Sequence, residues 1–190
     1  GAVRLTDWGV IRAAGADAAS FLHGQLTQDI VGMDPGVARM AGYCSAKGRI
    51  LASGLLLRPA PETIWFCVAP SVLEATAKRL SMFVMRAKVK LRALSADAVS
   101  VGLVGSAAGS LWPSEQVNAL VHPWQATSMG TEEGCHQALV RLPDVLGLSR
   151  FLWVGPATQS TVLLANAGTL TPEAWSWLDV MSGVPLVQAE

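Results

Sequence analysis

Residues 37–58, VARMAGYCSAKGRILASGLLLR, decide the fold, because they contain two strand-forming stretches joined by a short connection. Apolar and β-prone residues dominate 37–43 and 49–58, and Ser45-Ala46-Lys47-Gly48 lies between them. The Lys-Gly pair supplies the flexible backbone that a hairpin requires. The stretch therefore predicts an antiparallel pair of strands.

Local signals on both sides of this pair predict helices that pack on the strands. Toward the N-terminus, a strand over 9–14 is followed by Asp17 as a helix N-cap and by apolar residues at helical spacing through 18–30. Toward the C-terminus, a strand over 63–68 leads into a Ser-x-x-Glu capping box over 71–74. Hairpins and helices therefore mix without the strict alternation of a parallel sheet.

A further strand is predicted over 86–93, where cationic and apolar side chains alternate strictly. The cationic face would suit an anionic ligand tail, RNA phosphates or an acidic partner. An edge strand protected by charge against aggregation explains the same pattern and is the preferred interpretation. The cations are Arg86, Lys88, Lys90 and Arg92.

A second cycle of strands and helices begins after a junction at 94–97. It ends with a helix over 172–182, for which Thr171 is the expected N-cap and Gly183 part of the stop signal. The order of elements predicts an α+β protein of two small sheet-and-helix units. The other elements expected in this half are strands over 99–104, 123–128, 137–142 and 150–154 and helices over 106–112, 114–120 and 156–167.

The composition of the 190 residues excludes several classes of protein. Hydrophobic residues make up 51% and charged residues 15%, and 14 Lys and Arg balance 14 Asp and Glu, which excludes a disordered chain and a polycationic nucleic-acid coat. The longest apolar runs, 50–57 and 64–70, are too short to span a membrane, and the first residues lack a secretory signal. The three cysteines form no C-x-x-C pair, which fits a reducing cytoplasm. We therefore expect a cytoplasmic protein without a membrane partner.

Motifs of common enzymes are absent from the sequence. It contains no G-x-S-x-G, H-E-x-x-H, Walker loop or G-x-G-x-x-G motif. Its Asp and Glu residues are scattered, and its three His lack metal-ligand spacing. The sequence therefore names no catalytic residue and no metal site, and it argues against an ordinary hydrolase or dinucleotide enzyme.

Tryptophan is the main aromatic residue, with seven Trp against one Tyr and four Phe. An indole is a flat apolar platform with a polar N–H, suited to a heteroaromatic ligand ring, but core packing is its commoner role. Core packing is expected for Trp65 and Trp153, which lie in apolar runs. Trp8 precedes a strand, and Trp175 and Trp177 are two apart on a helix, so only one of that pair packs inward.

Two further polar features have functional and structural explanations. Gln25 and Asp29, four residues apart, would orient a polar ligand or close a helix end by hydrogen bonds. Cys44 has no basic neighbour nearer than Lys47, which favours an inert, half-buried cysteine over a reactive thiol.

Four stretches together resemble a known family. Gly24-Gln25-Leu26-Thr27-Gln28-Asp29 is similar to the G-Q-[LV]-T-x-D segment of the YgfZ-type folate-binding proteins, which are relatives of the aminomethyltransferase (T-protein) of the glycine cleavage system. WGVIRAAGAD at 8–17 resembles the family's opening strand, and SAKGR at 45–49 its hairpin. WSWLDVMSGVP at 175–185 resembles its closing helix and stop. The motifs occur in the family's order.

The resemblance implies two ferredoxin-like α+β units, followed in full-length members by a small β-barrel that is absent here. We accordingly expect a first unit of the folate-binding domain over 1–95, a second unit over 96–168, and a closing helix over 169–190 that packs back on that domain. The family's K-G-C-Y-x-G-Q-E segment, with its functional Cys, does not occur in the sequence. Cys44, Cys67 and Cys135 therefore inherit no role, and the chain is expected to be the N-terminal portion of a longer protein.

The resemblance also implies a function and a ligand. Tetrahydrofolate, or a one-carbon derivative of it, is the implied cofactor, and Trp8 and Trp175 match the two Trp that flank the family's folate cavity. The implied role is that of an accessory protein, not a classical enzyme, that supports iron–sulfur cluster assembly or repair and, through it, tRNA modification. Its implied partners are folate and iron–sulfur or thiol-bearing client proteins, without direct binding of nucleic acid.

Two alternatives stay open. The first is an aminomethyltransferase that transfers a one-carbon unit to tetrahydrofolate. The T-proteins carry an acidic residue where this chain has Leu51-Ala52-Ser53-Gly54-Leu55, so the sequence favours the accessory role. The second is a non-catalytic interaction module in which apolar side chains occlude the pocket.

Overall fold

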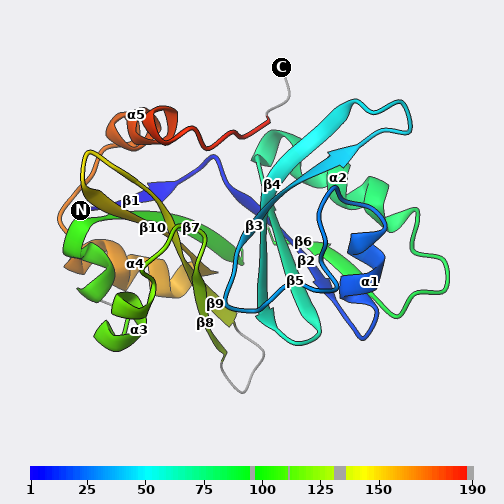
Figure 1. Ribbon diagram of the computed structural model, residues 1–190, viewed down its shortest axis with the longest axis horizontal. Coiled ribbons are helices and arrows are strands. Elements are labelled where there is room, and N and C mark those ends of the chain that lie inside the picture. The colour runs from blue at the N-terminus through cyan, green and yellow to red at the C-terminus, as the bar shows by residue number, and fades with distance from the viewer. Residues whose placement is uncertain (95–96, 111, 131–135, 188–190) are drawn as a thin grey trace. The chain divides into compact units, whose positions relative to one another are not determined.

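The computed structural model describes residues 1–94, 97–110, 112–130 and 136–187, which form two compact units. Unit 1 contains Gly1–Thr6 and Ala96–Pro185, and unit 2 contains Asp7–Ser95 and Leu186–Glu190. Within the described residues each unit has one five-stranded antiparallel sheet with helices packed on it (Figure 1). The predicted α+β class with two sheet-and-helix units is confirmed.

The sheet of unit 2 has the strand order β3-β4-β5-β2-β6. Because β5 lies between β2 and β4, the chain makes a split β-α-β crossover, as in ferredoxin-like folds, and β3 is an additional edge strand. The helices α1 and α2 cover one face of the sheet. The elements are β2 (Gly9–Ala14), α1 (Ala18–His23), β3 (Arg39–Cys44), β4 (Ile50–Ala60), β5 (Thr63–Val68), α2 (Pro70–Ser81) and β6 (Lys90–Ala93).

Alternation along the strands builds the core of unit 2. Ile11 pairs with Phe66 across β2 and β5, and both side chains pack against the apolar faces of α1 and α2. The immediate neighbours of Ile11 in β2 and of Phe66 in β5 point to the opposite face of the sheet. The core also includes Ala18, Leu22, Leu56, Ile64, Val68, Leu73, Ala77 and Leu80.

The sheet of unit 1 has the order β1-β7-β10-β9-β8. Its edge strand β1 (Ala2–Leu5), which no sequence pattern predicted, pairs with β7 in the register Ala2 to Leu103. The 3-10 helix η1 and the helix α4 pack on one face of this sheet. The other elements are β7 (Ala98–Val104), η1 (Gly105–Ser110), α3 (Ser114–Ala119), β8 (Ala126–Gly130), β9 (His136–Val145), β10 (Leu148–Pro156), α4 (Ala157–Asn166) and α5 (Pro172–Ser182).

The helix predicted over 172–182 is confirmed in its bounds and in both of its end signals. The Thr171 side chain accepts a hydrogen bond from the Ala174 amide at 3.2 Å. Gly183 ends the helix in the left-handed conformation, with φ of 68°, which favours glycine. The ends of this helix are therefore set by local sequence. None of the described helices has the length and apolar character to cross a membrane.

Asp17 is the N-cap residue of α1, as predicted, but its carboxylate accepts a hydrogen bond from the Lys88 amide at 2.6 Å and none from α1. The predicted start of α2 and the predicted length of α1 are wrong. The N-cap of α2 is Ala69, because Pro70 takes the first helical position, where its missing N–H has no cost. The helix expected through 18–30 ends at His23, since the following residues pair with β3.

The charged strand expected over 86–93 is shorter than predicted. Only Lys90–Ala93 joins the sheet, as β6, at an edge beside β2. The expected alternation continues through the whole stretch, because Arg86, Lys88, Lys90 and Arg92 are exposed and Val89 is buried. The edge-strand interpretation is therefore confirmed for residues 90–93, the second half of the predicted strand.

The units divide the chain differently from the expected ranges in two respects. The first six residues belong to unit 1 through β1, and α5 packs with the sheet of that same unit. The chain passes from unit 2 to unit 1 near the expected junction at 94–97. Backbone pairing between distant segments, which sequence patterns do not report, places β1.

Candidate functional site

Trp175 lies on α5 and faces the sheet of unit 1. Its side chain is buried, with 1% exposed, whereas Trp177 on the same helix is 50% exposed. Helical spacing explains the contrast, because residues two apart lie on different sides of a helix. The expectation that one of the pair packs inward is confirmed, and Trp175 is that residue.

A glycine makes room for this indole. A Cβ on Gly102 of β7 would lie 2.5 Å from Cε3 of Trp175, closer than such atoms approach in proteins. Gly102 is therefore required for the close approach of the helix to the sheet. The two elements fit together only with a glycine at this strand position.

Arg150, on β10, is fully buried beneath α5. Its guanidinium lies 4.5 Å from the centroid of the Trp175 ring, donates to the Leu178 carbonyl at 3.2 Å and forms an ion pair with Asp179. A buried guanidinium is tolerated because it is paired, hydrogen-bonded and stacked on an aromatic ring. Arg150 thereby fastens α5 to the sheet.

Three buried polar atoms beneath α5 have no hydrogen-bond partner within the described part of the chain. They are Nε1 of Trp175, Nε of Arg150 and Oγ of Ser100. Ser100, Gly102 and Val104 alternate along β7, and Arg150 pairs with Val104, so these residues share one face of the sheet. Buried polar atoms are normally satisfied, so these three atoms have capacity for a hydrogen bond to a water or a ligand.

Trp8 belongs to unit 2 and directly precedes β2. Its side chain is buried, with 8% exposed. The following glycine, Gly9, lies against Leu73 of α2, since a Cβ there would be 2.8 Å from Leu73 Cδ2. The two predicted folate-binding residues are therefore both buried, Trp8 in unit 2 and Trp175 in unit 1.

The face of the unit 2 sheet opposite α1 and α2 is apolar and buried. Cys67 lies on this face, and burial raises the pKa of its thiol to about 12. Arg12 and Trp65 pair across β2 and β5 on the same face, and Nε of Arg12 and Nε1 of Trp65 are buried without a partner within the described residues. Trp65 is a core residue, as expected. The other buried residues of this face are Val10, Leu55 and Leu57.

The Gly24–Asp29 segment has a structural role in unit 2. The Thr27 hydroxyl accepts a hydrogen bond from the Gly42 amide at 2.8 Å, and the Thr27 amide donates to the Gly42 carbonyl at 2.9 Å. The Asp29 carboxylate accepts from the Gly32 amide at 3.1 Å and lies 3.3 Å from His23. Asp29 therefore shapes the loop that follows α1. It does not close a helix end as expected, because the helix stops at His23.

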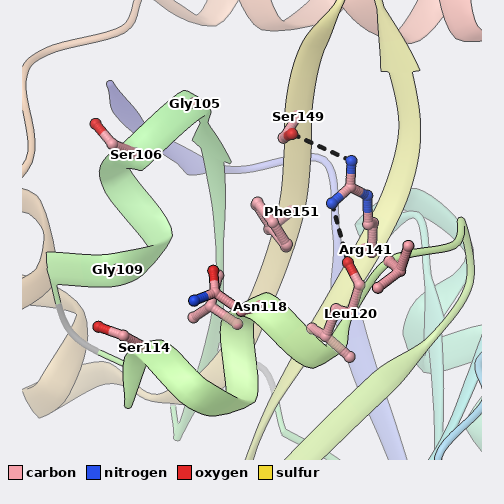
Figure 2. Close-up of a pocket in the computed structure, with 11 residues that line it drawn as sticks. Gly105, Ser106, Gly109, Ser114, Asn118, Leu120, Arg141, Ser149 and Phe151 are labelled. Atoms are coloured by element: carbon pink, nitrogen blue, oxygen red, sulfur yellow. Dashed lines mark hydrogen bonds between the residues drawn. The ribbon is translucent and has the colours of Figure 1, made fainter.

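A cavity of about 570 Å³ in unit 1 lies between α3, η1 and the sheet (Figure 2). Arg141 lines it beside Phe151, donates to the Leu120 carbonyl at 2.9 Å and forms an ion pair with Asp144 at 2.8 Å. The charge of Arg141 is thus balanced within the protein. The remaining polar groups in the lining are hydroxyls and an amide, which bind neutral molecules and supply no general base. They belong to Ser106, Ser114, Ser149 and Asn118.

The described residues contain no group of His, Cys, Asp and Glu arranged to hold a metal ion. Cys44 is half-buried and Cys67 is buried, whereas Cys135 lies outside the described residues. The half-buried position of Cys44 agrees with the structural explanation expected for it. Sequence reasoning missed Arg150, although one signal was present, namely a cation within the otherwise apolar run of β10.

Comparisons with known proteins give a consistent relationship. The chain is 30% identical to the "tRNA-modifying protein YgfZ" of Photorhabdus laumondii subsp. laumondii, and the match covers 98% of the chain and 55% of that protein. The protein of the same name from Yersinia pseudotuberculosis serotype O:1b is 28% identical over the same shares. The chain thus spans about half the length of the curated relatives it matches. No family model matches it.

Solved structures give the fold. The glycine cleavage system aminomethyltransferase T of Bartonella henselae matches with a TM-score of 0.77 at 17% identity, over 97% of this chain and 51% of that one. A heterotetrameric sarcosine oxidase from Corynebacterium sp. U-96 matches with a TM-score of 0.54 at 13% identity, over 90% and 87%. The chain is therefore a homologue of the proteins named YgfZ, matched over about half of their length, and it has the fold of aminomethyltransferase T.

Proposed function

We propose that this chain binds tetrahydrofolate, or a one-carbon derivative of it, as part of an accessory protein that supports iron–sulfur cluster assembly or repair and, through it, tRNA modification. The observation that carries the proposal is the similarity of 98% of the chain to proteins named for tRNA modification, on a fold shared with aminomethyltransferase T. The folate would be held, not chemically changed, by the residues of this chain.

The stretch expected to distinguish the two folate-related roles supports the accessory one. Residues 51–55 lie in β4 and carry no carboxylate that could orient a reacting nitrogen of the folate. The hydroxyl of Ser53 accepts a hydrogen bond from the Val187 amide at 2.8 Å, so it is used within the chain. A one-carbon transfer would need a charged group that this strand does not supply.

Trp175 is proposed to contribute its N–H to folate binding. The indole ring packs against Gly102 and Arg150, whereas Nε1 has no partner within the described residues. A polar heteroaromatic ligand carries acceptor atoms that would satisfy such a donor. Trp8 is proposed as a second, independent contributor through its apolar ring.

The test is calorimetric titration of the chain with tetrahydrofolate. We expect Trp8→Ala and Trp175→Phe to weaken binding, the first by removing apolar contact and the second by removing the N–H donor together with part of the ring. Trp177→Phe is the matched control, because this exposed indole lies on the same helix and should be neutral. Trp175→Phe retains an aromatic ring beneath Arg150, so that a change in affinity is distinguishable from unfolding.

Unchanged affinity in both Trp8→Ala and Trp175→Phe would reject these residues as the folate site. A wild-type chain that shows no binding would favour the occluded interaction module, which the burial of Trp175 also supports. Formation of methylene-tetrahydrofolate from an aminomethylated carrier protein would reverse the order of the first two functions. The cellular role is tested by the level of thiolated tRNA in cells that lack their own relative and express this chain.

A further inference from the structure

The segment from Ala75 to Leu94 in unit 2 has an unusual charge. It contains six of the chain's 14 Lys and Arg and none of its 14 Asp and Glu. Lys78, Arg79 and Arg86 are exposed and form no ion pair within the described part of the chain. A neutral protein thus carries a concentrated positive surface on one segment. We call residues 75–94 the cationic segment.

Large apolar side chains are exposed within this cationic segment. Met82, Phe83 and Met85 follow the end of α2 and are 65%, 50% and 89% exposed. Figure 1 shows this part of the chain as a loop that extends beyond α2 before it enters β6. Cations at a helix C-terminus and on an edge strand stabilise a fold, but exposed methionine and phenylalanine do not. Their exposure indicates a surface that binds a partner.

A cavity of about 410 Å³ adjoins the loop. It lies between α2 and the strands β3 and β4, and Lys78, Arg79 and Met82 form part of its lining. The remaining lining is mostly apolar, so the cavity suits an inserted apolar side chain flanked by carboxylates. The other lining residues are Tyr43, Leu51, Ser71, Val72, Ala75 and Thr76.

We propose that α2 and the cationic segment form a docking surface for an acidic segment of a partner protein, with an apolar side chain of that partner inserted beside Met82. Charge complementarity supports an acidic partner, since Lys78, Arg79 and Arg86 are free to pair with carboxylates. The cavity beside the loop can receive an apolar side chain, which favours a protein partner over a lipid surface. The cationic segment has one exposed aromatic residue, Phe83. Binding of single-stranded RNA requires several aromatic side chains on which successive bases stack. The surface does not depend on the proposed folate binding.

The experiment is selection of a random-peptide display library on the complete chain, followed by fluorescence anisotropy with the enriched peptides. We expect the enriched peptides to combine Asp and Glu with a large apolar residue. Binding should weaken at least about tenfold in the double variant Lys78→Glu/Arg79→Glu and in Met82→Ser/Phe83→Ser. It should also weaken as sodium chloride is raised, because the charges are exposed.

The matched controls are Arg4→Glu and Val180→Ser, which change an exposed cation and an exposed apolar residue of unit 1. Both should bind the peptides as the wild type does, and circular dichroism should show that every variant is folded. Three results would overturn the proposal. The first is enrichment of peptides without acidic residues, and the second is binding by Lys78→Glu/Arg79→Glu and Met82→Ser/Phe83→Ser that equals binding by the wild type. The third is tighter binding of a uridine oligonucleotide or phosphatidylserine vesicles through the same residues. A library that gives no binder dependent on these residues would overturn it as well.

Discussion

Unit 1 and unit 2 arrange their strands in the same order but complete their sheets from different parts of the chain. In unit 2 the first strand, β2, lies between β5 and the edge strand β6, which follows later in sequence. In unit 1 the corresponding strand, β7, lies between β10 and β1, which comes from the N-terminus. The two sheets thus have the same spatial order of strands, although the edge strand comes late in sequence in unit 2 and from the N-terminus in unit 1.

The two units also differ in the face of the sheet that lies opposite the paired helices. In unit 1 the helix α5 covers this face, and a buried cation, Arg150, holds it there. In unit 2 the corresponding face is mostly apolar and includes Cys67, and Arg12 on this face forms no ion pair within the described residues. We conclude that polar contacts stabilise one unit where apolar packing stabilises the other, and four predictions test this difference.

The largest effect is expected for Arg150→Ala in unit 1. Removal of the buried guanidinium breaks its ion pair with Asp179 and its stacking on Trp175, at a cost of about 3–5 kcal/mol. Arg12→Ala, in unit 2, should cost about 1 kcal/mol, since Arg12 is only half-buried and no ion pair is formed by its side chain within the described residues. Urea unfolding followed by circular dichroism measures both. Equal losses would remove the distinction between the units.

A smaller loss is expected where glycine permits close packing. Gly102→Ala places a methyl group against the Trp175 ring and should cost about 1–3 kcal/mol. Trp175→Phe removes the part of the ring that is contacted, so the double variant should lose less than the sum of the single variants. Gly54→Ala in unit 2 is the comparison, because its Cβ would meet the backbone carbonyl of Cys67. Because Cys67→Ala leaves this carbonyl in place, the stability losses of Gly54→Ala and Cys67→Ala should add in the double variant. A double variant more stable than this sum would contradict the explanation.

A loss of about 1 kcal/mol is expected for Thr171→Ala, because the N-cap hydrogen bond of α5 is lost. Thr171→Ser retains the hydroxyl and should restore most of the stability. The helices of unit 2 are not capped in this way, since neither α1 nor α2 has a side-chain bond from its N-cap residue. Thermal unfolding of the two variants measures the effect. Equal stability of Thr171→Ala and the wild type would show that α5 depends on Arg150 alone.

The thiol of Cys67 should have no effect on stability at neutral pH and should act only in alkaline solution. Burial raises its pKa from 9.0 to about 12, so the folded protein retains a proton that the unfolded chain loses. Stability should therefore be constant below pH 9 and fall as the pH rises from 9 toward 12. The fall should be absent in Cys67→Ala.

Thiol labelling tests the same burial more directly. In a Cys135→Ser background, Cys44 should react with a thiol reagent at pH 8 and Cys67 should not, since the thiolate fraction of Cys67 is reduced on the order of 10³-fold. Fast labelling of Cys67 would show that the apolar face of unit 2 opens readily. Apolar packing on this face would then not be what stabilises unit 2.

Local signals in the sequence were sufficient for much of the fold. The strands β2 and β5 and the helix α5 have the predicted bounds, because their patterns and end signals are local. The predicted helix through 18–30 was wrong, since pairing of Leu26 with Tyr43 outweighs the helical periodicity. β1 was missed because four residues at a chain terminus carry too little pattern.

The candidate site was less predictable than the fold. The sequence singled out Trp8 and Trp175, and only their surroundings show that both are buried. Arg150 was not singled out, because a lone cation within a strand does not indicate its partners. Asp179 and Trp175 lie more than twenty positions away in sequence, and the packing of α5 brings them to Arg150. Contacts of this kind are decided by three-dimensional packing.

The sequence by itself determined the α+β class, the hairpin at 37–58, the start and end of α5, and the resemblance that the homologues support. These features follow from side-chain alternation, caps and turns, which act over a few residues. The tertiary structure alone decided which unit receives β1 and α5, and that Met82 of the cationic segment lies exposed beside a cavity. Those outcomes depend on backbone pairing and burial between distant segments, where the favourable free energy belongs to the contact and not to either segment alone.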